Sequence, residues 1–101
     1  MTTVKLTLKE GTLFINGELS RYSLALISNN NYSSYFEGSE IVIDLSQVTK
    51  VDTAGLAWLF YLFEQATALA CQLSFIHLPI KLNKLITLSG VDGLLPVVSS
   101  E

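Results

Sequence analysis

The chain has 101 residues, of which half are hydrophobic and 15% are charged. This length fits one compact domain, here 1–101, and the apolar content suits a packed core, so a two-domain or a disordered chain is not expected. Six basic and nine acidic residues are scattered along the chain with a net charge of -3, which argues against nucleic acid as a partner.

The cysteine count and the hydrophobic profile favour a cytoplasmic protein. Cys71 is the only cysteine, so neither an internal disulfide nor a zinc-binding pattern is expected. The first twenty residues lack the features of a signal peptide. The most apolar stretch, 54–63, ends at Glu64, whereas a transmembrane helix needs about 20 apolar residues. We expect no direct membrane insertion, and a peripheral position at the inner membrane only through a partner.

The first elements expected along the chain are a β-hairpin and a short helix. Residues 4–8 alternate between polar and apolar, Glu10-Gly11 supplies a turn, and an apolar run resumes at 13–15. A helix is expected to start within 24–27, but the Asn and Ser residues of 29–34 are weak helix formers. We therefore predict a short first helix followed by a loop.

The middle of the chain predicts a central strand and a long helix. Residues 41–45 are mostly β-branched, as in a strand that is covered on both faces and ends at Asp44. From Thr53 to about Cys71 the chain is rich in Ala, Leu, Gln and Glu and contains no proline. Asp52 or Thr53 is the expected helix cap.

The last third predicts one more strand and one more helix. Residues 73–76 form the strand, Pro79 marks a break, and 80–86 have helical spacing until Gly90 stops them. The tail, 91–98, is compatible with an edge strand. Strands that alternate with helices imply crossover connections, and therefore an α/β fold with parallel strands and helices packed on the sheet.

Few side chains suit catalysis. A triad of Ser74, His77 and Asp44 can be written down, but the chain has no G-x-S-x-G elbow, and His77 is better explained as a structural histidine. Glycine-rich nucleotide-binding loops are absent from the sequence. Cys71 is expected to be a buried hydrophobe rather than a reactive thiol. We predict no enzyme activity, no cofactor and no metal site.

The start of the long helix is the most informative feature. Amide groups of Thr53, Ala54 and Gly55 are expected to point into solvent at the positive end of the helix dipole, where they suit a partner's acceptor groups. Gly55 costs about 1 kcal/mol within a helix relative to alanine, and close approach of another backbone is one reason to keep it. In the alternative interpretation, Asp52 or Thr53 is an ordinary cap and Gly55 packs against a neighbouring strand.

The same helix carries more apolar residues than one buried stripe requires. Trp58, Tyr61 and Leu62 are expected to fall toward the flank or the outside, where aromatic residues suit a protein interface. Alternatively, another helix covers them. The expected sheet-facing stripe consists of Leu56, Leu59, Phe60, Phe63, Ala66, Leu69 and Ala70.

These residues carry a resemblance to a known family. Ile43-Asp44-Leu45 followed by Val51-Asp52-Thr53-Ala54-Gly55-Leu56 resembles the STAS signature "D-L-x-x-V-x-x-V/I-D-S/T-x-G-L". Gly17-Glu18-Leu19 is similar to the family's "G-E-L-D" corner, although Ser20 replaces the aspartate, so no role is carried over to it. The resemblance implies a SpoIIAA-like fold, with a mixed, mostly parallel sheet of four to five strands and helices packed against it.

Two branches of the family give different functions. The "VDTAGLA" wording and Ala57-Trp58-Leu59 resemble MlaB-type STAS subunits of the Mla phospholipid-transport ABC complex. This resemblance implies a non-enzymatic subunit that stabilises or activates the transporter's cytoplasmic ATPase, in a complex with the permease that maintains outer-membrane lipid asymmetry. The residues implied to bind the ATPase are Asp52, Thr53, Ala54, Gly55, Leu56 and Trp58.

In the other branch, anti-sigma-factor antagonists, a partner kinase phosphorylates the residue at the position of Thr53 and thereby abolishes binding. The alternative function is therefore an antagonist of an anti-sigma factor kinase, switched at Thr53. A third hypothesis is a small enzyme or ligand-binding domain that holds an anion at the same helix start. It requires a pocket with convergent polar groups, and the sequence indicates none.

Overall fold

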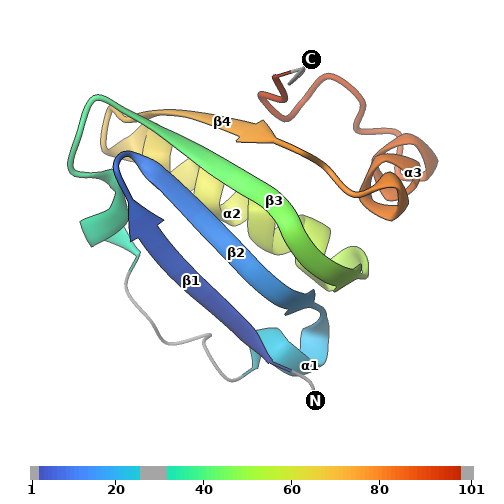
Figure 1. The fold of residues 1–101 in the computed structure, drawn as a ribbon. Coiled ribbons are helices and arrows are strands. Elements are labelled where there is room, and N and C mark those ends of the chain that lie inside the picture. Colours follow the sequence, from blue (N-terminus) through green and yellow to red (C-terminus); the bar gives the residue numbers. More distant parts are fainter. Residues whose placement is uncertain (1–2, 26–31, 99–101) are drawn as a thin grey trace.

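A four-stranded mixed sheet organises the chain in a computed structural model that describes residues 3–25 and 32–98 (Figure 1). β1 and β2 form the predicted antiparallel hairpin, whereas β3 pairs in parallel with β2 on one side and with β4 on the other. The strand order is the chain order, and the fold is of the predicted α/β class. The strands are β1 (Val4–Lys9), β2 (Thr12–Leu19), β3 (Glu40–Val51) and β4 (Gln72–Ile76).

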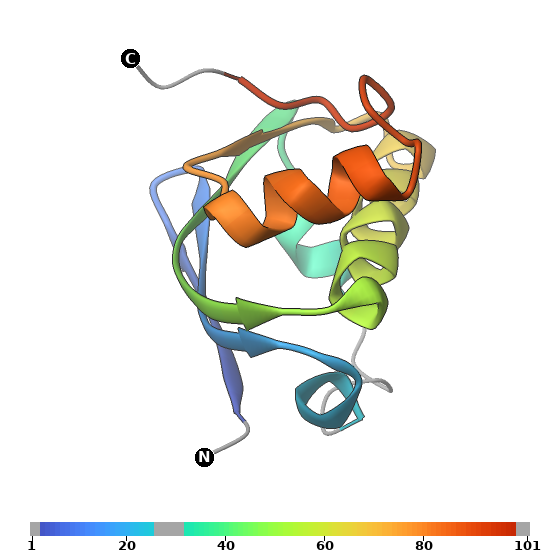
Figure 2. The ribbon, with the colours of Figure 1, turned by 90° about the vertical axis from the view of Figure 1, so that its right-hand side faces the viewer.

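The helices lie on one side of this sheet. Figure 2, turned by 90° from Figure 1, shows α2 and α3 on the same face, and no helix of the described residues lies on the other. The prediction that the central strand is covered on both faces is therefore wrong: Ile41 and Ile43 are buried, while Val42, between them, is only partly buried. The helical elements are α1 (Arg21–Leu24), a 3-10 turn η1 (Ser33–Phe36), α2 (Thr53–Ala68) and α3 (Ile80–Leu88).

The core lies between the sheet and α2. Alternate strand residues point toward the helices, because successive side chains of a strand face opposite sides. Residues of α2 that recur every three or four positions meet them. The side chains that are fully buried include Leu13, Ile15, Ile43, Leu59, Leu62 and Phe75.

The first helix begins earlier than the sequence predicts. Ser20 caps α1 by accepting a hydrogen bond from the Ser23 backbone N–H at 3.3 Å, and the Ser23 hydroxyl accepts one from the Ser20 N–H at 3.1 Å. This reciprocal cap fixes the start at Arg21. Of the expected 24–27 helix, Leu24 closes α1, and residues 26 and 27 lie outside the described residues, as do 29–31 of the expected loop.

β3 is longer than predicted, and α2 is shorter. The strand continues past Asp44 to Val51 because β2 remains alongside to pair with it, with two register shifts, whereas β4 ends opposite Asp44. The helix stops at Ala68 instead of Cys71: Ala70 has a left-handed φ of 57°, and the Cys71 N–H turns back to the carbonyl of Ala66 at 2.8 Å. Cys71 is buried, as expected.

The C-terminal part follows the predicted order. α3 begins directly after Pro79, and Gly90, with φ 71°, follows its end. The tail adds one isolated parallel bridge between Val97 and Phe75 at the outer edge of β4, rather than a fifth strand, within the described residues. The predicted tail is thus an edge element, but only at a single residue.

Candidate functional site

The start of α2 is held against the end of β2. β3 delivers the chain to Asp52, whose backbone N–H donates to the carbonyl of Leu19 at 3.1 Å. The Asp52 carboxylate then accepts the N–H of Gly55 at 3.0 Å through Oδ1. Asp52 is therefore the N-cap, one of the two caps that the sequence left open. Thr53 is the first residue of the helix.

The second carboxylate oxygen of Asp52 reaches a different helix. Oδ2 accepts the backbone N–H of Arg21, the first residue of α1, at 3.2 Å. One side chain thus joins the starts of α1 and α2. This link could not be predicted from the sequence, because the two residues are 31 positions apart and a capping pattern indicates only local partners.

Gly55 is explained by a close approach within the chain. A Cβ atom at this position would lie 2.9 Å from the carbonyl carbon of Leu19 and closer still to its oxygen. Only glycine lets the helix pack this near to β2. Close backbone contact was the predicted reason for Gly55, and the backbone concerned is the neighbouring strand, as the alternative interpretation had it.

Exposure divides the six residues implied to bind the ATPase. Thr53 is exposed, Asp52 and Ala54 are partly buried, and the remaining three, Gly55, Leu56 and Trp58, are buried. The amide of Gly55 is also taken by Asp52, so only the amides of Thr53 and Ala54 are left at the helix start in the described part of the chain. The exposed part of the site is therefore smaller than predicted.

Of the three α2 residues that were expected to lie toward the outside, only Tyr61 is exposed. The prediction that Trp58 and Leu62 lie toward the outside is wrong: Trp58 is 9% exposed and Leu62 is fully buried. The ring of Tyr32, just before η1, packs edge-on against Trp58 with centroids 5.7 Å apart. Tyr61 remains 43% exposed. The expected sheet-facing stripe holds for Leu56, Leu59 and Ala66, while its last two members, Leu69 and Ala70, are exposed.

Two residues that the sequence did not single out complete the exposed surface. Tyr22 of α1 is 61% exposed, and the guanidinium carbon of Arg21 lies 4.9 Å from the centre of its ring. The Arg21 side chain also donates a hydrogen bond to the Tyr22 hydroxyl at 2.8 Å. We define the α2-start surface as Arg21, Tyr22, Thr53, Ala54 and Ala57. A helix of four residues is too short to give a periodic signal, which is why the sequence did not reveal this surface.

The candidate catalytic residues meet only in part. His77 Nδ1 lies 3.3 Å from Asp44 Oδ2, and Asp44 also accepts the N–H of Ser46 at 2.8 Å. Burial raises the pKa of Asp44, but the hydrogen bonds from Ser46 and His77 outweigh it, so the pKa lies below its ordinary value. Among the described residues, no hydrogen bond joins Ser74 to His77. The Asp44–His77 pair is therefore not connected to the serine hydroxyl that the triad would use as its nucleophile.

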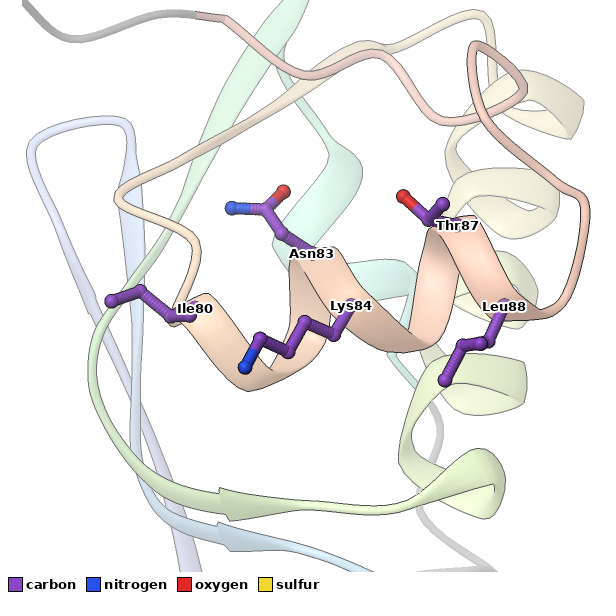
Figure 3. A pocket seen from close by; sticks show the side chains of 5 residues that line it. All are labelled: Ile80, Asn83, Lys84, Thr87 and Leu88. Carbon is purple, nitrogen blue, oxygen red and sulfur yellow. The ribbon is translucent and has the colours of Figure 1, made fainter.

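Three hollows of the described surface lie away from the start of α2. The first, of about 420 Å³, is an open depression along α3, and Figure 3 shows that all its labelled side chains come from this one helix. Two others lie toward the C-terminal end of α2, around Phe63 and Thr67. A hollow lined by one helix does not enclose a ligand. The depression along α3 is lined by Ile80, Asn83, Lys84, Thr87 and Leu88.

Residues 3–25 and 32–98 offer neither a metal site nor a membrane-spanning helix. These residues contain no cluster of three His, Cys, Asp or Glu side chains that would hold a metal ion. None of the helices in the same two segments is both long and apolar enough to cross a membrane.

Comparisons with known proteins extend over almost the whole chain. The family model described as "Mlab, STAS domain" matches residues 2–96. No curated protein sequence matches the chain.

Solved structures share the fold. The unphosphorylated anti-sigma factor antagonist SpoIIAA is 15% identical with a TM-score of 0.70, and the match covers 97% of this chain and 88% of that one. An anti-sigma-factor antagonist (STAS) domain protein from Planctomyces limnophilus is 12% identical with a TM-score of 0.70, covering 98% and 92%. Phosphorylated SpoIIAA from Bacillus is 16% identical with a TM-score of 0.62, covering 97% and 91%. With the family model, this establishes that the chain belongs to the STAS family.

Proposed function

We propose that this STAS domain is a non-enzymatic subunit of a phospholipid-transporting ABC complex, and that it docks on the cytoplasmic ATPase through the α2-start surface. The description of the matching family, "Mlab, STAS domain", and the "VDTAGLA" wording support the transporter branch. In this proposal the domain holds the ATPase in its assembled, active state. It reaches the inner membrane only through the ATPase and the permease.

The observation that carries the proposal is the contrast between Thr53 and its neighbours. Asp52 and Gly55 are engaged in contacts within the domain, which fix the helix start before any partner arrives. Thr53 is exposed, and its hydroxyl makes no hydrogen bond in the described part of the chain. A fixed site loses little conformational entropy when a partner binds.

The residues around Thr53 suit close approach by a protein. Ala54 and Ala57 have side chains of one carbon, so a partner backbone can come near the first turn of the helix. The amides of Thr53 and Ala54, at the positive end of the helix, are available to carbonyl or carboxylate oxygens. The Thr53 hydroxyl can both donate and accept. These groups give a small interface with a polar centre.

The test is affinity capture with the tagged protein from its native cell, read by mass spectrometry. Wild type is expected to recover an ABC ATPase and its permease, and Thr53→Glu to lose both, because a carboxylate fills the space and repels acceptor groups. Thr67→Glu places the same change at the exposed C-terminal end of α2 and serves as the matched control. Capture that survives in Thr53→Glu contradicts the site, and capture without an ATPase contradicts the function.

A second candidate is a phosphorylation switch at Thr53 that controls binding to an anti-sigma factor kinase. It is favoured by the exposed Thr53 hydroxyl and by similarity to an antagonist solved in both phosphorylated and unphosphorylated forms. A phosphate adds about 1.5–2 negative charges next to Asp52, which would repel an acidic partner surface. Recovery of a kinase in place of the ATPase, together with phosphate on Thr53, would support this function.

A further inference from the structure

We infer that Arg21 and Tyr22 of α1 form a second anchor for the same partner, in which Arg21 binds an acidic side chain of the ATPase and Tyr22 packs beside it. This inference rests on the proposed function. It adds residues outside the signature segment and specifies the chemistry of the partner surface opposite them.

The side chains of the two residues are held together and exposed. The Arg21 guanidinium stacks over the ring of Tyr22 and donates to its hydroxyl, while Tyr22 keeps 61% of its surface exposed. Stacking and the hydrogen bond restrict two long side chains to one arrangement. Tyrosine and arginine are also among the residues that contribute most to protein interfaces, because each buries a large area and keeps a polar group.

Among the described residues, no carboxylate forms an ion pair with the Arg21 guanidinium. The only ion pair among the described residues joins His77 and Asp44, and the sequence of 26–31 contains no Asp or Glu. The Asp52 carboxylate contacts the backbone N–H of Arg21 and not its guanidinium. A guanidinium presents five N–H donors in a planar fork that matches a carboxylate, so an acidic side chain of the partner is the complement that fits.

The position of this pair is tied to the proposed docking site. Asp52 accepts from Gly55 of α2 and from Arg21 of α1 with its two oxygens, so the starts of the two helices keep a constant spacing. Thr53 directly follows Asp52. A protein that contacts Thr53 with an interface of ordinary size therefore meets Arg21 and Tyr22 as well.

The experiment measures the affinity of the purified ATPase for wild type and for Arg21→Glu and Tyr22→Ala. Lys84→Glu makes an equal change of charge on α3 and is the matched control. We expect binding to weaken about tenfold or more for Arg21→Glu and Tyr22→Ala, and to change less than about twofold for the control. Salt screens the attraction between Arg21 and an acidic side chain. The affinity of wild type is therefore expected to fall more steeply with salt concentration than the affinity of the double variant Arg21→Ala, Tyr22→Ala.

The outcomes separate the inference from the proposed function. If Thr53→Glu abolishes binding while Arg21→Glu and Tyr22→Ala bind like wild type, the second anchor is wrong and the docking site stands. If the ATPase does not bind wild type, both are wrong. Urea unfolding of each variant, expected to match wild type because both side chains are exposed, distinguishes loss of contact from loss of fold.

Discussion

The α2-start surface and the outer face of α3 are both exposed, but they are built in opposite ways. At the start of α2, contacts from β2, Asp52 and α1 meet within a few residues, and the exposed side chains are small or polar apart from Tyr22. Along α3 the exposed residues include Ile80 at 75% and Leu88 at 84%, and the N-cap Pro79 makes no side-chain hydrogen bond.

This difference shows that exposed apolar area, as on α3, is not the same as a binding site whose backbone is fixed in advance, as at the start of α2. Single exposed aliphatic residues are common on protein surfaces and identify no function on their own. A site whose backbone is fixed by several independent contacts presents the same groups to every partner, which favours specific recognition. The comparison predicts that substitutions of Asp52 and Gly55, which fix the helix start, affect folding. Substitutions of the exposed residues of the α2-start surface are expected to affect binding, and those on the outer face of α3 neither folding nor binding.

The largest expected effect comes from Gly55→Ala. The added methyl group would collide with the Leu19 carbonyl, so α2 must move away from β2, and we expect a loss of about 3 kcal/mol in the free energy of unfolding. Urea denaturation measures this. Gly38→Ala, whose Cβ would approach nothing nearer than 3.9 Å, is the control and is expected to stay within about 0.5 kcal/mol of wild type. Equal stability of the two variants would contradict the close packing.

The next effect is that of Asp52→Ala. Loss of the carboxylate leaves Gly55 and Arg21 N–H groups without their acceptor, and we expect destabilisation of about 1–2 kcal/mol. Asp52→Asn retains an oxygen for the cap and is expected to lose less. Asp92→Ala removes a carboxylate that accepts from Thr87 at 3.3 Å beyond the end of α3, and should change stability by less than about 0.5 kcal/mol. Thermal unfolding of the three variants ranks them, and a larger loss for Asp92→Ala would reverse the comparison.

A smaller effect is expected from pH, at the Asp44–His77 pair that ties the segment before α3 to the sheet. Because the folded pKa of Asp44 lies below its unfolded value of about 3.9, its contribution to stability is present above that value and is lost as pH falls through the folded pKa. The exposed His77 limits the size of the contribution. Urea unfolding below about pH 4 should show a shallower fall in stability for Asp44→Asn than for wild type. Equal slopes would mean that Asp44 does not contribute.

The smallest effect is predicted for Leu88→Lys. Leu88 is 84% exposed at the end of α3, where a positive charge is favourable to the helix dipole, so stability should stay within about 0.5 kcal/mol of wild type. Binding of the ATPase should also be unchanged. Any clear loss of binding would show that α3 belongs to the interface and that the two surfaces differ less than proposed.

Most of the element order was predictable from sequence because it depends on local patterns. The hairpin at Glu10-Gly11, the helix that follows Asp52 and the helix between Pro79 and Gly90 all carry turn or cap residues that act on their neighbours. The end of β3 was not predictable, because the strand continues only where β2 lies alongside it. One-sided coverage of the sheet likewise depends on where the helices pack.

The candidate site was predictable in position but not in composition. The pattern around Asp52 located the helix start and its cap. It did not reveal that Trp58 turns inward to meet Tyr32, since helical periodicity cannot say which neighbouring element covers a residue. It also did not reveal Arg21 and Tyr22, which join the site through Asp52, a contact over long sequence distance.

The single bridge between Val97 and Phe75 affects how readily copies of this domain can associate through the edge of the sheet. Phe75 donates its N–H to the carbonyl of Pro96, and its carbonyl accepts the N–H of Val98, both at 2.9 Å, so the tail occupies the outward-facing backbone groups of this β4 residue. A sheet edge with free backbone groups is a template for edge-to-edge association and fibril growth. The proline in this segment cannot donate a further ladder bond, so the tail itself is a poor template. Pairing of another strand at Phe75 would first require the tail to detach.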